Sequence, residues 1–270
     1  MPVRRVAAGI AAGLVVLIAV LVAGARTPEE RRAEPAVTTT TTRSAPLTAT
    51  VTSVPVTLPG GHPESITVAD AVVPKIQLFD APDVVSLTSG FPTEQEGVLD
   101  NPTWEKLPVV FLVKEIKPNW VHVAVSTRPN GRMAWVRASD VAIRSVPNWI
   151  RVELGNRKAT VYHGTAVVME APVAVGTDAA PTPTGSYFVD GALKLRNPNG
   201  EYGAYQLSIS AFSDIFQRFG SGVGQIALHG TNRPDLLGQA VSHGCVRFSN
   251  EAITRMIELA PLGTPVEIVP

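Results

Sequence analysis

Cysteine is nearly absent from this sequence, which has one, Cys245, among 270 residues. A single cysteine cannot close a disulfide within the chain, and it excludes zinc sites that need two or more cysteines. Charge is balanced as well, because 23 basic and 23 acidic residues give a formal net charge of zero and neither sign forms a long block. Nucleic-acid-binding proteins present a basic stripe, so no nucleic-acid partner is expected. A chain of this size buries ordinary hydrophobic cores and does not need disulfides to fold.

The longest run without charged or strongly polar residues lies near the N-terminus, where Val6–Ala25 follows a pair of arginines. A helix rises about 1.5 Å per residue, so about 20 apolar residues span the hydrocarbon core of a bilayer. Residues 1–25 therefore predict a membrane anchor that spans through residues 6–25, with the rest of the chain outside the cytoplasm. The segment Ala23-Gly-Ala25 also fits a signal-peptide cleavage site, so cleavage after Ala25 and secretion to the cell wall stays open. Both alternatives predict an extracytoplasmic protein.

Residues 26–65 are rich in threonine, proline and alanine, and they include the run Thr38–Thr42. Such a segment has too few aromatic and branched apolar side chains to offset the entropy that ordering would cost. The composition predicts a disordered linker, stiffened locally by its prolines, between the anchor and the residues that follow.

Residues 66–146 contain short apolar segments separated by turn-forming residues. Val121, Val123 and Val125 alternate with other residues, as in a half-buried strand, and Asn130-Gly131 is a strong hairpin signal. The clearest strands are expected at residues 76–79, 109–114, 120–125 and 133–136. This succession resembles a bacterial SH3-like domain, which implies a small β-barrel.

Three tryptophans of this region, Trp104, Trp120 and Trp135, allow two interpretations. They fill the core of the small barrel, which is the favoured interpretation, or they line a groove that binds a peptide or a glycan. His122 stands between two valines of an expected strand, which predicts a side chain that faces solvent.

Residues 147–270 form a second β-rich region. Ile150, Val152 and Leu154 alternate with charged residues, and Gly155-Asn156 predicts a two-residue hairpin turn. Residues 190–224 carry turn residues rather than a clear strand pattern, so we expect a long loop that acts as a lid.

One helix is expected directly after Cys245. Ser249 and Asn250 are residues that cap the free N–H groups of a first turn, and Pro261 ends the pattern. The apolar residues between these limits recur at helical spacing on one face, at Ile253, Met256, Ile257 and Ala260.

Cys245 lies beside Gly244 and is near two histidines in the sequence, His229 and His243. A free thiol has a pKa of about 8.5, so a reactive cysteine needs a base or a cation nearby. A turn at glycine lets backbone N–H groups point at an oxyanion that forms beside the sulfur. Taken alone, these residues also fit an inert buried cysteine, or a zinc site formed by the cysteine and both histidines.

The motif His229-Gly-Thr is followed, after a spacer, by Ser242-His-Gly-Cys-Val-Arg247, and Pro181-Thr-Pro-Thr-Gly185 lies upstream. This pattern resembles the catalytic domain of the L,D-transpeptidase (YkuD-type) family. The resemblance covers residues 147–270 and implies a β-sandwich-like fold. The expected architecture is therefore mostly β, with an SH3-like small β-barrel followed by this catalytic domain and a helix after the nucleophile.

The resemblance also implies roles for the motif residues. Cys245 is expected to be the catalytic nucleophile and His229 its base, with one ring nitrogen of His229 held by the backbone carbonyl of Gly230. No metal and no organic cofactor is implied.

Other motif residues are expected to bind the substrate or its oxyanion. Backbone N–H groups around His243, Gly244 and Cys245 would form the oxyanion hole, and Ser242 stands in the same motif. Arg247 either binds a substrate carboxylate or acts as a structural anchor, and the sequence leaves both alternatives open.

The activity implied by the resemblance is peptidoglycan L,D-transpeptidation, a step of cell-wall biogenesis that affects cell shape and is sensitive to carbapenems. The enzyme would attack a stem tetrapeptide, release its terminal D-Ala and pass the acyl group to a diaminopimelate amine, forming a 3→3 cross-link. Two alternatives stay open: an L,D-carboxypeptidase that transfers to water, and a non-catalytic cell-wall-binding protein. The sequence defines no oligomeric state.

Overall fold

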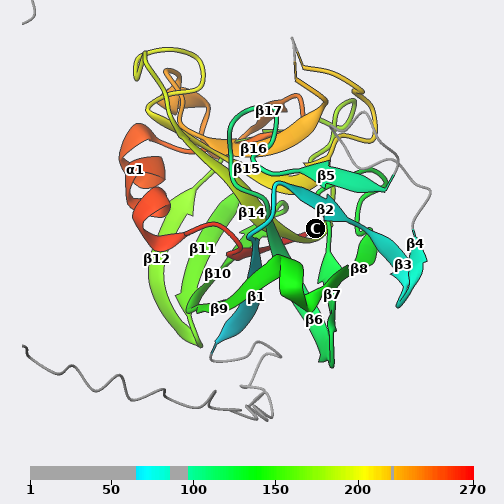
Figure 1. Ribbon diagram of the computed structural model, residues 1–270. Helices are drawn as coiled ribbons and strands as arrows, with labels where there is room; N and C mark the ends of the chain where they lie inside the picture. The colour runs from blue at the N-terminus through cyan, green and yellow to red at the C-terminus, as the bar shows by residue number, and fades with distance from the viewer. Residues whose placement is uncertain (1–64, 86–96, 220–221) are drawn as a thin grey trace, which may run out of the picture. The chain divides into compact units, whose positions relative to one another are not determined.

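A computed structural model of the protein describes residues 65–85, 97–219 and 222–270 (Figure 1). These residues are mostly β and contain one α-helix, as predicted, and they lie within one compact unit, residues 52–270. The expected membrane segment, residues 6–25, and all but the last residue of the expected linker lie outside the described residues. Within the described ranges, no helix has the length and apolar character needed to cross a bilayer.

The first half of the described chain forms a seven-stranded sheet in the order β4-β3-β8-β7-β6-β1-β9, with β2 and β5 paired separately. Its neighbouring strands pair antiparallel throughout. The elements are β1 (Ile66–Ala71), β2 (Lys75–Gln77), β3 (Phe79–Ala81), β4 (Val84–Val85), β5 (Val98–Asp100), β6 (Val110–Lys117), β7 (Trp120–Ala124), β8 (Met133–Arg137), the 3-10 helix η1 (Ala138–Asp140) and β9 (Val141–Val146).

Two of the three tryptophans in this half are core residues, and the third is not. Trp120 and Trp135 are buried, and Trp120 packs edge-on against Phe79 with ring centroids 4.8 Å apart. Trp104 is 48% exposed and belongs to neither core. The expected solvent-facing position of His122 is wrong, because its ring is half-buried and stacks on Trp135 at 4.6 Å.

The second half forms an eight-stranded sheet in the order β12-β11-β10-β19-β14-β15-β16-β18, with β13 and β17 as a separate parallel pair. Two neighbouring pairs of this sheet, β10–β19 and β16–β18, are parallel. The elements are β10 (Asn148–Glu153), β11 (Lys158–His163), β12 (Ala166–Pro172), β13 (Val175–Gly176), β14 (Gly185–Lys194), β15 (Tyr205–Phe212), β16 (Gln225–His229), η2 (Pro234–Leu236), β17 (Ala240–Ser242), β18 (Val246–Arg247), α1 (Asn250–Leu259) and β19 (Pro265–Val269).

The helix α1 follows the predicted pattern, and Figure 1 shows it in orange-red. The Ser249 hydroxyl caps its first turn by accepting the N–H of Ala252 at 3.0 Å. Ile253 and Met256 are fully buried in the main core of the second sheet, so this one face fixes the helix to the sheet.

Two predictions about this half are wrong. Glu153 pairs with Lys158, so the first hairpin has a four-residue loop, and the residue with positive φ is Arg157 (51°), not the glycine or asparagine before it. Residues 190–224 are not one long loop, because β14 runs to Lys194 and β15 fills 205–212. A register shift between Val189 and Gly191 breaks the alternation that would have shown that β14 continues beyond residue 190.

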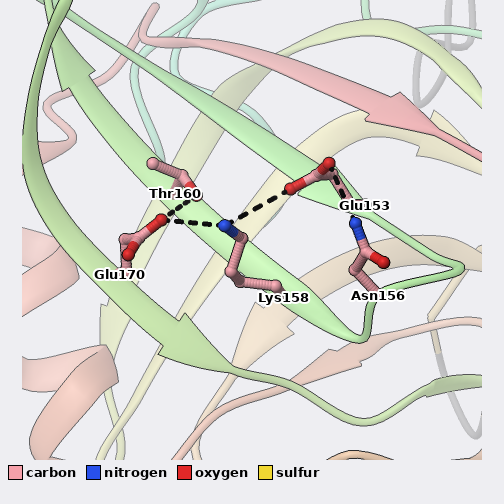
Figure 2. Close-up of polar contacts among 5 residues, drawn as sticks. All are labelled: Glu153, Asn156, Lys158, Thr160 and Glu170. Carbon is pink, nitrogen blue, oxygen red and sulfur yellow. Dashed lines mark hydrogen bonds and ion pairs between the residues drawn. The ribbon is translucent and has the colours of Figure 1, made fainter.

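Figure 2 shows the polar cluster that covers the first hairpin of this sheet. The Lys158 ammonium lies 2.9 Å from the Glu170 carboxylate and 3.7 Å from that of Glu153, while Asn156 donates to Glu153 at 3.2 Å. Thr160 donates to the same Glu170 oxygen at 3.3 Å. Exposed ion pairs of this kind contribute little to stability, so the hairpin depends mainly on the apolar face beneath it.

A separate hydrophobic cluster joins the two sheets. It contains Val68 and Val110 from the first sheet, Trp149 and Phe188 from the second, and Leu262 packed against them. This shared core fixes the first sheet against the second, which carries the candidate site.

Candidate active site

Two parallel strands, β16 and β18, bring the motif residues together. Leu228 pairs with Val246 and His229 with Arg247. Alternate residues of a strand share a face, so Leu228 and Val246 point into the hydrophobic core while His229 and Arg247 lie on the opposite face. Continuing the register places Cys245 on that same face.

A cavity of about 220 Å³ opens on this face. It is lined by five of the seven predicted site residues: Cys245, His229, Ser242, His243 and Arg247. The other two, Gly230 and Gly244, do not line the cavity. The carbonyl of Gly230 holds the ring of His229, and Gly244 forms the turn before Cys245.

His229 is held as a neutral base. One ring nitrogen, Nδ1, lies 2.6 Å from the carbonyl oxygen of Gly230, as expected, so Nδ1 carries the proton and Nε2 is free to accept one. Burial lowers the pKa of His229 to about 4; the bond to Gly230 opposes this effect, and the charge of Arg247 adds to it. A side chain at Gly230 would collide with the amide oxygen of Asn250, so the close carbonyl requires glycine.

This depressed pKa predicts acid sensitivity of the fold. In the unfolded chain the imidazole takes up a proton near pH 6.5, whereas the buried ring resists protonation until about pH 4. The stability from His229 is therefore complete above pH 6.5 and is lost as the pH falls toward 4. We expect about 3 kcal/mol of the free energy of unfolding to be lost between pH 7 and pH 4 from this group. Urea unfolding of wild type and His229→Gln at both pH values measures it, since the variant lacks this titration; equal losses in both proteins would contradict the prediction.

Cys245 is partly buried at the other side of the cavity. Burial raises the pKa of its thiol, against the lowering effects of a hydrogen bond with the backbone of Ala227 and of the charge of Arg247. At neutral pH the resting pair is thus a protonated thiol and a neutral imidazole. Such a pair becomes reactive when the imidazole removes the thiol proton during attack.

The turn before Cys245 is fixed by Ser242. Its hydroxyl donates to the carbonyl of Cys245 at 2.6 Å and accepts the N–H of Gly244 at 3.1 Å. The N–H of Gly244 is therefore already bonded and is not free to bind an oxyanion. Gly244 has φ of 120°, a conformation that L side chains rarely adopt.

Thr182 supports this turn, although no role was predicted for it. Its buried hydroxyl accepts the N–H of Gly176 at 2.9 Å and donates to the carbonyl of Gly244 at 2.8 Å. The only signal in the sequence was its place in the Pro181-Thr-Pro-Thr-Gly185 segment.

Aromatic rings cover both histidines. Tyr202 lies over His229 with ring centroids 4.8 Å apart and is 46% exposed, and Phe216 contacts the exposed His243 edge-on at 5.9 Å. Neither ring was predicted, because both lie in loop segments without a motif.

Arg247 points along the cavity wall with only 14% of its side chain exposed. One terminal nitrogen lies 3.7 Å from the exposed carboxylate of Glu201, and its Nε is buried without a hydrogen-bond partner among the described residues. A buried guanidinium with a free N–H is suited to bind an anionic group.

The first sheet holds the outer wall of the cavity. Arg128, from the β7–β8 hairpin, donates to the carbonyls of Ser213, Phe216 and Val223 at 2.9, 3.0 and 3.3 Å. Asn130, from the same hairpin, exchanges two hydrogen bonds of 2.8 Å with the backbone of Phe212. The wall segment that follows β15 is thus tied to the first sheet.

Replacing Arg128 with alanine removes all three of these charge-assisted bonds. We expect the free energy of unfolding to fall by about 2 kcal/mol and the backbone amides of residues 213–219 to exchange faster, because the cavity wall becomes less rigid. Urea unfolding and hydrogen exchange measure the two effects. Arg255→Ala, at an exposed ion pair on α1, is the control and should change stability by less than about 0.5 kcal/mol. Equal effects of the two substitutions would show that the wall does not depend on Arg128.

The described residues bring together no group of three histidine, cysteine or acidic side chains that could hold a metal ion. The alternative of a zinc site from His229, His243 and Cys245 therefore lacks the ligand geometry that it requires.

A neutral imidazole and a thiol on one face of neighbouring strands, in an open cavity, is the arrangement of cysteine-dependent acyl-transfer enzymes. The family model of the L,D-transpeptidase catalytic domain, YkuD, matches residues 147–268. YkuD of Bacillus subtilis is 36% identical over 124 residues, which are 46% of this chain and 67% of that protein. YkuD of Bacillus licheniformis is 35% identical over 126 residues, 47% of this chain and 68% of that protein. The structure of Bdellovibrio bacteriovorus Bd1075 is 27% identical with a TM-score of 0.37, over 46% of this chain and 48% of that one.

The chain belongs to the L,D-transpeptidase family. A transpeptidase moves an acyl group from one amine to another, so the protein is an enzyme of the acyltransferase class. The matched residues include the eight-stranded sheet and α1. Residues 66–146 lie outside the match, and their assignment as an SH3-like domain stays a prediction, as do the domain boundaries.

Proposed function

We propose that this protein is a peptidoglycan L,D-transpeptidase in which Cys245 is the nucleophile and His229 the base. Sγ of Cys245 attacks the carbonyl that precedes the terminal D-Ala of a stem tetrapeptide, while Nε2 of His229 takes the thiol proton. The N–H groups of His243 and Cys245 stabilise the oxyanion of the tetrahedral intermediate. When the intermediate collapses, the C–N bond breaks, His229 returns the proton to the leaving amine, and D-Ala departs from a thioester.

In the second half of the reaction, the acyl group passes from Cys245 to the acceptor. A neutral amine on the side chain of a neighbouring diaminopimelate attacks the thioester carbonyl, and His229 accepts the proton that the amine loses. The C–S bond breaks, the thiol recovers its proton, and the new amide is a 3→3 cross-link. Both halves need a base that is neutral at pH 7, which fits the lowered pKa of His229.

The bond from His229 Nδ1 to Gly230 is the observation that carries this proposal. It fixes the tautomer that leaves Nε2 as the proton acceptor, and Nε2 belongs to a ring that lines the same cavity as Cys245. We assign Arg247 to the binding of a substrate carboxylate, because its buried Nε has no partner among the described residues.

An extracytoplasmic location is part of the proposal, since the substrate lies in the cell wall. Residues 1–25 would anchor the enzyme to the membrane or be cleaved after Ala25, and residues 26–65 would tether the folded part. The same acylation chemistry predicts a covalent carbapenem adduct on Cys245.

Incubation of the purified protein with disaccharide tetrapeptide, followed by mass spectrometry of the muropeptides, tests the proposal. Cross-linked dimers with loss of D-Ala are the expected products. Tripeptides alone would assign the enzyme as an L,D-carboxypeptidase that uses water as acceptor. Unchanged tetrapeptide, together with binding to wall material, would support a non-catalytic wall-binding protein and overturn the proposal.

A further inference from the structure

A smaller cavity of about 70 Å³ adjoins the catalytic cavity. Both cavities are lined by Trp104, Glu105, Ser208 and Gln225, so the two spaces meet along these four residues. Trp104 and Glu105 come from the connection between β5 and β6 in the first half of the described chain, whereas Ser208 and Gln225 lie on β15 and β16 in the second sheet. The smaller cavity is thus built by both halves of the protein.

Asp190, on β14, lines this smaller cavity. Its Oδ2 accepts hydrogen bonds from the Ser126 hydroxyl and from Gln225, the latter at 2.6 Å. The Ser208 hydroxyl also contributes a hydrogen bond to this carboxyl group, whereas Oδ1 is buried and has no partner at full hydrogen-bonding geometry among the described residues. A buried carboxylate oxygen without a well-formed hydrogen bond is costly, because it has lost its water.

A second carboxylate faces the same space from the rim. Burial raises the pKa of Glu105, and the negative charge of Asp190 raises it further, so the two groups repel each other. Burial also raises the pKa of Asp190, against the hydrogen bonds that it accepts. A cation between the two would relieve both effects.

Trp104 completes the rim with a ring that is 48% exposed. An indole face beside two carboxylates suits a cation on an alkyl stem, because the ring attracts the charge and packs against the methylenes. The cavity is small, so it fits the end of one side chain rather than a whole residue.

We propose that Trp104, Glu105 and Asp190, which we call the acidic subsite, bind an alkylammonium group at the end of a side chain of the wall peptide. This inference rests on the proposed function and names the feature of the substrate that the enzyme selects. Stem peptides offer such an ammonium on the acyl donor, and also on the acyl acceptor, where the same amine would bind here before it loses its proton and moves to the thioester. The acidic subsite accordingly makes the first sheet part of substrate recognition.

The donor arm of the test compares two tetrapeptides that carry lysine or norleucine at the third position, side chains of similar length with and without the ammonium. For wild type, we expect kcat/KM of acyl-enzyme formation to be roughly tenfold higher with the lysine peptide than with the norleucine peptide. This is the ratio expected for one charge-assisted contact. Glu105→Gln and Asp190→Asn should each bring this ratio close to one. Glu258→Gln, at an exposed ion pair on α1, should leave it unchanged.

The acceptor arm starts from the preformed norleucine thioester and measures the KM of an amine-bearing acceptor peptide. A rise in this KM in Glu105→Gln, without a change in the donor ratio, would assign the ammonium to the acceptor. An unchanged donor ratio together with an unchanged acceptor KM in both variants overturns the inference. Glu105 is exposed on a connecting segment, so its variant folds even if Asp190→Asn does not.

A binding measurement separates this inference from the proposed reaction. In the Cys245→Ala background, calorimetry should show tighter binding of the lysine peptide than of the norleucine peptide, and Glu105→Gln should remove the difference. If wild type forms no acyl-enzyme while this preference persists, the proposed function fails and the subsite stands. If acyl-enzyme forms and the preference is absent, only the subsite fails.

Discussion

Replacement of Cys245 with alanine is expected to abolish acyl-enzyme formation and cross-linking, with a fall in rate of at least about 10⁴-fold. The proposed reaction needs a covalent bond from the substrate carbonyl to Sγ, and no other thiol exists in the sequence to replace it. Mass spectrometry of intact protein, incubated with tetrapeptide or a carbapenem, should show the adduct in wild type and no mass change in the variant.

The variant should remain folded, because the removed atom is small and only partly buried. We expect its free energy of unfolding to stay within about 1 kcal/mol of wild type, so the loss of activity cannot be assigned to unfolding. An adduct of the same mass on Cys245→Ala would place the nucleophile elsewhere and refute the assignment.

His229→Ala is expected to slow acylation by about 10³-fold, within the range that a general base contributes. Without Nε2, nothing removes the thiol proton during attack, and burial keeps the thiol protonated at neutral pH. Part of the lost rate should return as the pH is raised, because solvent hydroxide then produces the thiolate. The pH–rate profile of acylation, measured for wild type and variant between pH 5 and pH 10, tests both statements.

His243→Ala is the matched comparison for this prediction. The His243 side chain is exposed and no pairing with a backbone carbonyl fixes its ring among the described contacts, so its loss should slow acylation far less. A profile in which His243→Ala, and not His229→Ala, loses the neutral-pH activity would transfer the role of base to His243.

The fold could be predicted where local patterns and packing agree. The helix after Cys245 has a capping serine, an apolar face and a closing proline, and it forms as expected. The second part of β14, from Asp190 onward, was not predicted because Gly191 and a register shift interrupt its alternation. Its partner β15 was not predicted because the asparagines and glycines between the two strands are typical of a loop. Propensity describes a single strand, whereas the pairing of these two depends on residues distant in the sequence.

The site could be predicted as far as the motif extends. The bond between His229 and Gly230 follows from neighbouring residues, so a resemblance in sequence sufficed to expect it. Tyr202, Arg128 and Thr182 reach the site from distant segments, and only the folded chain shows their contacts. The motif also assigned the N–H of Gly244 to the oxyanion, and the structure shows that the Ser242 hydroxyl already accepts it.

The position of β19 has a consequence for the order in which the sheet can be completed. This strand lies between β10 and β14, and it is the link through which β10–β12 join the strands that carry His229 and Cys245. It is also made after both of those residues. While the chain is being synthesised, the sheet stays in two unjoined parts until residue 269 has emerged.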